Sequence, residues 1–84
     1  MYLHIGNELM LAASDIIGIF DLDKTTVSSI TKKYLTAAEK TGNLRSVGED
    51  LPKSFVVCQR GEDQTVYLSP ISSGTLNIRS ARPL

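Results

Sequence analysis

Residues 54–69 read SFVVCQRGEDQTVYLS, which has the pattern of two strands joined by a turn. Residues 54–60 and 65–69 each alternate in side-chain type well enough to form a strand. Gly61 and its polar neighbours lie between them, as the turn of a β-hairpin requires. The stretch therefore predicts a hairpin, and the segments on either side of it supply the remaining elements.

A second hairpin is predicted at the N-terminus. Residues 2–5 and 8–12 are short apolar stretches separated by Gly6-Asn7, a pair that suits the positive φ angles of a tight turn. Residues 15–22 follow with the sequence DIIGIFDL, which is too short for a helix and rich in β-branched and aromatic side chains. We expect this run to be the central strand of the sheet.

Residues 26–41 carry a helical pattern. Their apolar side chains recur at three- and four-residue steps and form one stripe, which consists of Val27, Ile30, Tyr34, Ala37 and Ala38. Gly42 then suits the left-handed cap at the end of a helix. At about 100° per residue, Lys33 and Lys40 project from the opposite side, with Lys32 nearby. We expect the apolar face to lie on the sheet and the lysines to face the solvent.

The rest of the chain adds short elements. Residues 43–52 are polar and irregular, with room for a short strand at 44–47, and Ser72 or Ser73 can cap a terminal helix that runs through Arg79. The pattern as a whole predicts an α+β fold in a single domain, residues 1–84. Its small, mostly antiparallel sheet consists of two hairpins and a central strand, with one amphipathic helix packed on it and a short C-terminal helical turn.

The composition is that of a globular protein, because 42% of the 84 residues are hydrophobic and 21% are charged. A chain of this length buries roughly 60 to 65% of its unfolded surface, so its stability is modest and self-association would add to it. Cys58 is the only cysteine, which excludes an intramolecular disulfide and fits a reducing compartment. The sequence shows neither a secretion signal nor the roughly 18 apolar residues of a membrane span. We expect a cytoplasmic protein with no membrane partner.

Nine basic and nine acidic residues cancel, so the chain lacks the overall positive charge typical of nucleic-acid-binding proteins. The basic residues nevertheless gather in two regions. Residues 24–45 contain five of them against Glu39 alone, and residues 64–84 contain Arg79 and Arg82 with no acid. The lysine side of the predicted helix could contact phosphates, or it could simply be a solvated face.

The segment most like part of an enzyme is IGIFDLDKTT, residues 17–26, since a strand followed by Asp-x-Asp-x-Thr resembles the first motif of haloacid-dehalogenase-type phosphatases. This resemblance would make Asp21 the nucleophile and Asp23 the acid and base. Such chemistry also needs Mg²⁺, a phosphate-binding lysine, further acids and a doubly wound domain larger than this chain. Asp21, Asp23 and Thr25 can instead form a polar turn that caps the next helix. We therefore predict no catalytic residues and no enzyme.

No metal or cofactor site is predicted either. His4 is the only histidine, and a zinc site would need three or four ligands at a recognisable spacing. Cys58 follows three apolar residues in a predicted strand, where a free cysteine usually behaves as a small buried side chain. The loops G-x-x-x-x-G-K-[ST] and G-x-G-x-x-G, which hold nucleotide phosphates, do not occur in the sequence.

Four strings together resemble a known family: YLHIGN at residues 2–7, DIIGIFD at 15–21, EDLPKSFVV at 49–57 and YLSPISSGTL at 67–76. They are similar to the bacterial extracellular matrix regulatory proteins RemA and RemB, and most similar to the RemB branch. The resemblance covers residues 1–79 in order and without large gaps, so it is more specific than any single motif.

The resemblance implies a small cytosolic protein that promotes the expression of biofilm matrix genes. It also implies relatives in the RemA branch that bind DNA and assemble into a ring around which DNA can wrap. If this chain is similar, self-association would create the extended basic surface that one neutral subunit does not have.

The sequence departs from the RemA branch where that branch carries arginines: the equivalent positions here are Asp15, Leu51 and Pro52. An aspartate that faces phosphate would repel it, and Leu-Pro offers little beyond the Leu amide. Lys53 adjoins Leu51 and Pro52, which occupy the positions of two of these arginines. A lysine gives only a point charge, whereas the planar guanidinium of an arginine can donate two parallel hydrogen bonds to a phosphate. Otherwise Lys32, Lys33 and Lys40 would have to act, or DNA is not the ligand.

Our first hypothesis is a homo-oligomeric regulatory protein of matrix gene expression that binds duplex DNA weakly through phosphates. A ring is one form that this oligomer could take. Its candidate DNA-binding residues are Lys53, Lys33, Lys40 and Lys32. The alternative is a non-catalytic interaction module that contacts another regulatory protein through sheet edges and the ELMLAA stretch of residues 8–13.

Overall fold

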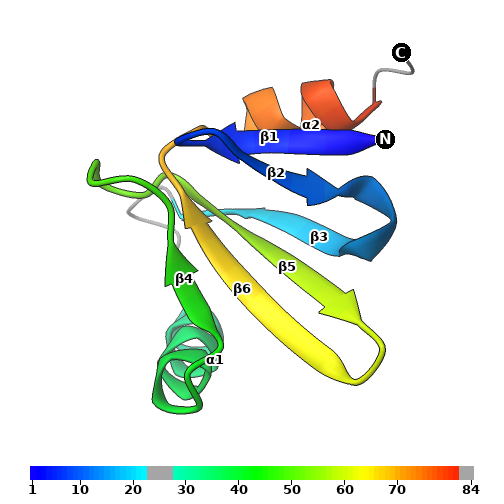
Figure 1. Ribbon diagram of the computed structural model, residues 1–84. Coiled ribbons are helices and arrows are strands. Elements are labelled where there is room, and N and C mark those ends of the chain that lie inside the picture. Colours follow the sequence, from blue (N-terminus) through cyan, green and yellow to red (C-terminus); the bar gives the residue numbers. More distant parts are fainter. Residues whose placement is uncertain (23–27, 82–84) are drawn as a thin grey trace.

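The computed structural model describes residues 1–22 and 28–81, which form two sheets and two α-helices (Figure 1). In chain order the elements are β1 (Tyr2–Gly6), β2 (Leu9–Ala12), the 3-10 helix η1 (Ala13–Asp15), β3 (Ile16–Asp21), α1 (Ser29–Lys40), β4 (Leu44–Ser46), β5 (Ser54–Arg60), β6 (Asp63–Ser69) and α2 (Ser73–Ala81). β1 and β2 form a sheet of their own, and the other four strands form a sheet in the order β3, β5, β6, β4. Only β4 and β6 pair in parallel, so the predicted, mostly antiparallel α+β class is confirmed.

β3 lies at the edge of the four-stranded sheet, so the prediction that it is the central strand is wrong. Gly61, with a φ of +62°, allows a two-residue turn in which Arg60 lies opposite Asp63. β6 therefore begins two residues earlier than predicted and occupies one side of β5, while β3 occupies the other. β4 then adds beyond β6, and the N-terminal hairpin forms a separate sheet instead of extending β3.

The N-terminal hairpin is confirmed, but its turn lies one residue later than predicted. Asn7 and Glu8 adopt left-handed φ angles of +47° and +63°, whereas Gly6 belongs to the end of β1. Asn tolerates this conformation better than most residues, because its short polar side chain can bond locally to the backbone.

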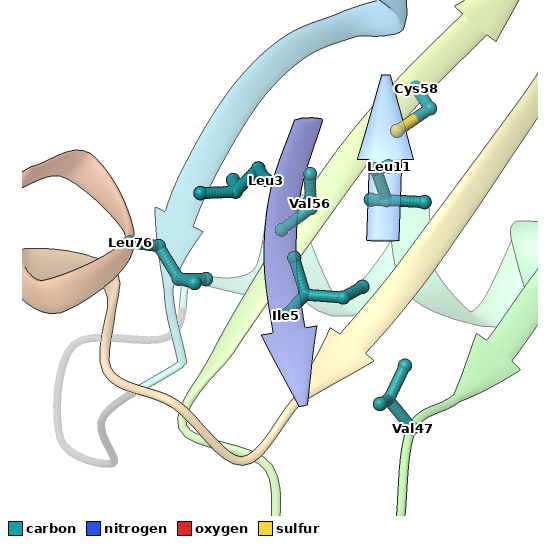
Figure 2. Close-up of a cluster of buried hydrophobic side chains, with 7 residues drawn as sticks. All are labelled: Leu3, Ile5, Leu11, Val47, Val56, Cys58 and Leu76. Atoms are coloured by element: carbon teal, nitrogen blue, oxygen red, sulfur yellow. The ribbon is translucent and has the colours of Figure 1, made fainter. Parts of the chain in front are cut away.

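Two hydrophobic cores lie on the two faces of the four-stranded sheet. The first core joins the N-terminal hairpin and α2 to the sheet, and Figure 2 shows its buried members Leu3, Ile5, Leu11, Val47, Val56, Cys58 and Leu76. The second core lies under α1 and has the buried members Ala38, Phe55, Val57 and Val66. β5 alternates between the two cores, which explains why its sequence is a continuous run of buried residues.

α1 begins and ends with capping structures, of which the sequence predicted only the one at Gly42. The Ser28 side chain accepts the backbone N–H of Thr31 at 3.1 Å. Gly42 has a φ of +78°, and the N–H of Asn43 then reaches back to the carbonyl of Ala38 at 2.9 Å. This arrangement is a Schellman motif, which satisfies the last carbonyls of the helix. Residues 26 and 27, where the helix was predicted to begin, lie outside the described residues.

The buried side of α1 differs from the predicted apolar stripe. Ala38 is buried and Tyr34 is half-buried, as predicted, but Ile30 is 78% exposed and Ala37 is also exposed. Leu35, which the stripe left out, packs against the second core instead. The Tyr34 hydroxyl donates a hydrogen bond of 2.8 Å to Gln64, which fixes the helix against β6.

Two buried serines join the hairpin, the sheet and the segment before α2. Ser54 and Ser69 lie opposite each other in β5 and β6, and both are fully buried. The Ser69 hydroxyl donates to the carbonyl of Ile5 at 2.6 Å and accepts the N–H of Ile71 at 3.1 Å. The Ser54 hydroxyl donates to the carbonyl of Ile71 at 2.7 Å. Each buried hydroxyl therefore has a partner, as burial requires.

α2 begins where Ser72 was expected to cap it, since the Ser72 hydroxyl accepts the N–H of Thr75 at 3.2 Å. It continues to Ala81 and is a helix of nine residues, longer than the predicted turn. Its fully buried side chain, Leu76, fills the space between the N-terminal hairpin and the sheet (Figure 2). Packing of this one residue into the first core explains why the segment is a stable helix despite Gly74.

Candidate nucleic-acid interface

Three of the four predicted DNA-binding lysines lie on α1, and all three are exposed. Lys33 and Lys40 are two helical turns apart on the same side, at a rise of about 10 Å, and Lys32 adjoins them. Glu39 is the only acid in the helix. Lys40 lies in the last turn, where a cation also stabilises the helix dipole, so part of this charge pattern serves the helix itself.

Lys53 continues the ladder of the sheet immediately before β5. Its N–H donates to the carbonyl of Ser69 at 2.8 Å, and its carbonyl accepts the N–H of Leu22 at 2.9 Å. Because side chains alternate along an extended strand, Lys53 belongs to the same face as Phe55 and Val57, which pack under α1. All four lysines therefore occur on the α1 side of the sheet, three on the helix and one at the end of the sheet.

The positions that depart from the RemA branch lie at opposite ends of the pair formed by β3 and β5. Asp15 precedes β3 at the end where Arg60 finishes β5, while Leu51 and Pro52 precede β5 at the other end. Seven residues of strand separate the two ends, which is roughly 20 Å. One subunit therefore does not bring these positions together.

Asp15 does not stand alone, because Arg60 donates a hydrogen bond of 3.0 Å to its carboxylate. The Arg60 side chain is 80% exposed, so most of it still faces the solvent. The predictions from sequence missed this cation. No spacing in the sequence points to it, because only the antiparallel pairing of β3 with β5 places Arg60 beside Asp15.

A groove of about 380 Å³ runs between the N-terminal hairpin and the end of β5 and β6 at which their connecting turn lies. Tyr2, Met10 and Tyr67 contribute apolar surface to it, and the pair of Asp15 and Arg60 lies at its side. Cys58 also lines the groove but is buried, and burial together with the nearby Asp15 carboxylate raises the pKa of its thiol to about 11. A thiol with such a pKa is neutral at physiological pH and is a poor nucleophile.

The raised pKa of Cys58 predicts how stability depends on pH. The thiolate is disfavoured only in the folded state, so the contribution of the neutral thiol is complete below pH 9 and is lost as pH rises from 9 to 11. We expect the wild-type protein to lose about 2 kcal/mol more than Cys58→Ala between pH about 8 and about 10.5. Urea unfolding of both proteins at the two pH values measures this difference. Lysines and tyrosines titrate alike in the two proteins, so their contributions cancel in the comparison. Equal losses would contradict the buried, neutral thiol.

The remaining residues considered for chemistry lie on separate strands or outside the described residues. Asp21 ends β3 and is exposed, while Asp23 and Thr25 lie outside the described residues. His4 lies in β1, and its backbone carbonyl accepts a hydrogen bond from Arg79 at 3.1 Å. Across residues 1–22 and 28–81, no three His, Cys, Asp or Glu side chains are arranged to hold a metal ion. Neither of the two described α-helices has the length and hydropathy needed to cross a membrane.

Comparison with known proteins agrees with the four strings in the sequence. The family model described as "RemA-like: Extracellular matrix regulatory protein A-like" matches residues 2–79. "Extracellular matrix regulatory protein B" of Bacillus subtilis (strain 168) is 39% identical over 80 residues, which cover 95% of this chain and 90% of that protein. The matched region contains every described strand and nearly the whole of α2.

Proposed function

This chain belongs to the RemA-like family of extracellular matrix regulatory proteins, and we propose that it is a cytoplasmic, homo-oligomeric regulatory protein of matrix gene expression. In this proposal it binds duplex DNA weakly and mainly through phosphates. Lys53 is the primary contact in this proposal, and Lys32, Lys33 and Lys40 are secondary contacts.

The observation that supports DNA binding is the distribution of lysines on the α1 side of the sheet. α1 carries three exposed lysines against one acid, and Lys53 lies at the end of the same side. A lysine that contacts phosphate releases condensed counterions and adds affinity that does not depend on base sequence. Because a lysine offers a point charge and not a directed fork, these contacts position DNA without selecting bases.

Self-association would supply the extended basic surface that one subunit lacks. The chain is neutral overall, and four lysines are a small footprint on a duplex. Repetition of the α1 side around an oligomer would present these lysines as a continuous series along the DNA backbone. The first partner that we propose is therefore a second copy of the same chain.

Lys53→Glu tests the proposal directly. We expect it to weaken binding to all DNA sequences alike, by about tenfold, because one phosphate contact is lost and a repulsive charge replaces it. The slope of log affinity against log salt concentration should fall by about 1. Titration of labelled duplexes of unrelated sequence at several salt concentrations measures both effects, and an unchanged affinity would remove Lys53 from the interface.

Arg79→Glu is the matched control for Lys53→Glu. It changes the charge by the same amount, but Arg79 lies on α2, which packs on the opposite face of the sheet. We expect it to affect DNA binding much less. Equal effects of the two variants would mean that net charge alone governs the affinity.

A second candidate function is an interaction module that acts on another regulatory protein without binding DNA. Exposed apolar side chains favour it, and among the large ones that the structure describes Leu51 is the most exposed, at 87%. The ELMLAA stretch contributes less than predicted, because Leu11 is buried in the first core while Met10 is half exposed. Binding to a partner that survives high salt, together with no affinity for DNA, would favour this function.

A further inference from the structure

The arginines of the described residues differ in what surrounds their side chains. Arg60 donates to the carboxylate of Asp15, which offsets its charge. Arg79 lies on α2, on the face of the sheet away from α1. Arg45 lies on β4, which follows α1 directly (Figure 1). Within the described residues no carboxylate forms an ion pair with Arg45, although Glu8 lines the same groove of about 430 Å³.

The side chain of Arg45 turns around the edge of the sheet toward α1. Leu44 packs under α1 and Val47 packs in the first core, so alternation makes Arg45 leave β4 on the face of the N-terminal hairpin. β4 is the end strand of the four-stranded sheet, where a long side chain can reach around the edge. Its Nη1 donates to the carbonyl of Gly42 at 2.6 Å and to that of Leu44 at 3.3 Å. These bonds hold the guanidinium at the C-terminal end of α1.

This anchorage leaves the other donors of the guanidinium for a ligand. An arginine has five N–H donors in one plane. Within the described residues the hydrogen bonds of Arg45 use Nη1 alone, and the residue is exposed. Nε–H and one N–H of Nη2 point the same way, and such a pair matches two oxygens of one phosphate. A side chain that is already held in place also loses less freedom on binding than a free lysine does.

The end of α1 around Arg45 carries an excess of positive charge. Lys40 lies in the last turn, two residues before the Gly42 carbonyl that holds Arg45, and Lys33 lies two turns earlier on the same side. Against these three cations stand Glu39, about 100° around the helix from Lys40, and about half a negative charge from the helix dipole. The balance favours an anion at this end of the helix.

We propose that Arg45 makes the directed contact of the DNA interface, with Nε–H and Nη2 donating two parallel hydrogen bonds to one phosphate beside a phosphate that Lys40 contacts. A lysine accepts many phosphate geometries, whereas the arginine pair accepts few, so Arg45 fixes where the DNA backbone lies on α1. The contact carries no information about base sequence. This inference rests on the DNA binding of the proposed function and adds to its interface a residue on β4.

The bond from Arg45 to Gly42 also stabilises the end of α1, because the last carbonyls of a helix need donors. That structural role uses Nη1 and leaves Nε–H and Nη2 unexplained. A test of the proposal must therefore separate the loss of the anchor from the loss of the phosphate contact.

Arg45→Lys and Arg45→Ala together make this separation. Arg45→Lys keeps the charge and loses the parallel donors, so we expect the affinity for labelled duplex DNA to fall about fivefold while its salt dependence stays unchanged. Arg45→Ala also loses the charge, so the affinity should fall about tenfold or more and the slope of log affinity against log salt should fall by about 1. Duplexes of unrelated sequence should respond alike.

Arg79→Lys and Arg79→Ala are the matched controls. The Nη1 of Arg79 likewise donates to a backbone carbonyl, that of His4 at 3.1 Å, but on α2. We expect the two alanine variants to lower the urea midpoint of unfolding by similar small amounts, and only the Arg45 variants to weaken DNA binding strongly. Circular dichroism and light scattering on the same samples check the helix content and the mass of each variant.

The outcomes separate this inference from the proposed function. An Arg45→Lys variant that binds DNA as the wild type does would overturn the directed contact, and equal losses of affinity in Arg45→Ala and Arg79→Ala would reduce the effect to net charge. DNA binding that Lys53→Glu weakens and Arg45→Ala does not would overturn this inference alone. A wild-type protein that ignores duplex DNA even at low salt would overturn the proposed DNA binding itself.

Discussion

Leu76→Ala should lower the free energy of unfolding by about 3 kcal/mol. Leu76 is fully buried, and it is the only buried side chain among the described side chains of α2. Its removal leaves a cavity between α2 and the N-terminal hairpin, at the place where Leu3 and Ile5 of the first core lie (Figure 2). A small domain has a total stability of roughly 5 to 15 kcal/mol, so this one change should remove a large part of it.

Ile78→Ala is the control for this cavity. It removes an aliphatic group of the same size from the same helix, but Ile78 is exposed, so we expect a loss below about 0.5 kcal/mol. Urea unfolding followed by circular dichroism measures both variants, with unchanged slopes showing that the comparison is valid. Similar losses in the two variants would mean that α2 is not held by Leu76.

Ser69→Ala should cost about 2 to 3 kcal/mol, which is unusually large for the loss of one oxygen atom. The hydroxyl satisfies two backbone groups at once, the carbonyl of Ile5 and the N–H of Ile71, in a fully buried position. Without it, neither group regains water, and each carries part of the desolvation penalty. Ser46→Ala, in the exposed part of β4, is the control and should change stability little.

Ser54→Ala adds a test of the coupling between the two serines. Ser54 and Ser69 both bond to the backbone of Ile71, so the loss of one should loosen the partner of the other. We expect the double variant to lose less than the sum of the single losses, because neighbouring groups that share a partner are not additive. Additive losses in this double-mutant cycle would show that the two hydroxyls act independently.

The sequence predicts which segments form strands and helices better than it predicts their order in space. Alternation identified the hairpin of residues 54–69, and the Gly6-Asn7 pair between two apolar stretches identified the N-terminal hairpin. Ser72 and Gly42 identified helix ends, and all these signals are local. The turn at Gly61 places β6 on one side of β5, so β3 can pair only with the other side and lies at the edge. Alternation along a single strand does not tell which strands are its neighbours. The exposure of Ile30 likewise depends on how α1 is rotated on the sheet, which Leu35 decides through tertiary packing.

The candidate interface divides in the same way. Helical periodicity was enough to place Lys33 and Lys40 on one exposed side of α1. Lys53 belongs to the same side of the sheet because Phe55 and Val57, the alternate residues of β5, face the second core. Arg60 contacts Asp15 because of the register between β3 and β5. Both depend on pairing between segments about 40 residues apart, which spacing in the sequence does not reveal.

The contact between α2 and β1 has a consequence for how this protein is made. Arg79 bonds to the carbonyl of His4, and Leu76 covers Leu3 and Ile5, so the first strand is completed by almost the last described residues (Figure 1). A ribosome adds roughly 5 to 20 residues per second, and the N-terminal hairpin emerges several seconds before its cover exists. During that interval its apolar side chains are exposed, so the first core closes only after Leu76 has emerged, and nascent chains that stop before Leu76 should remain sensitive to protease.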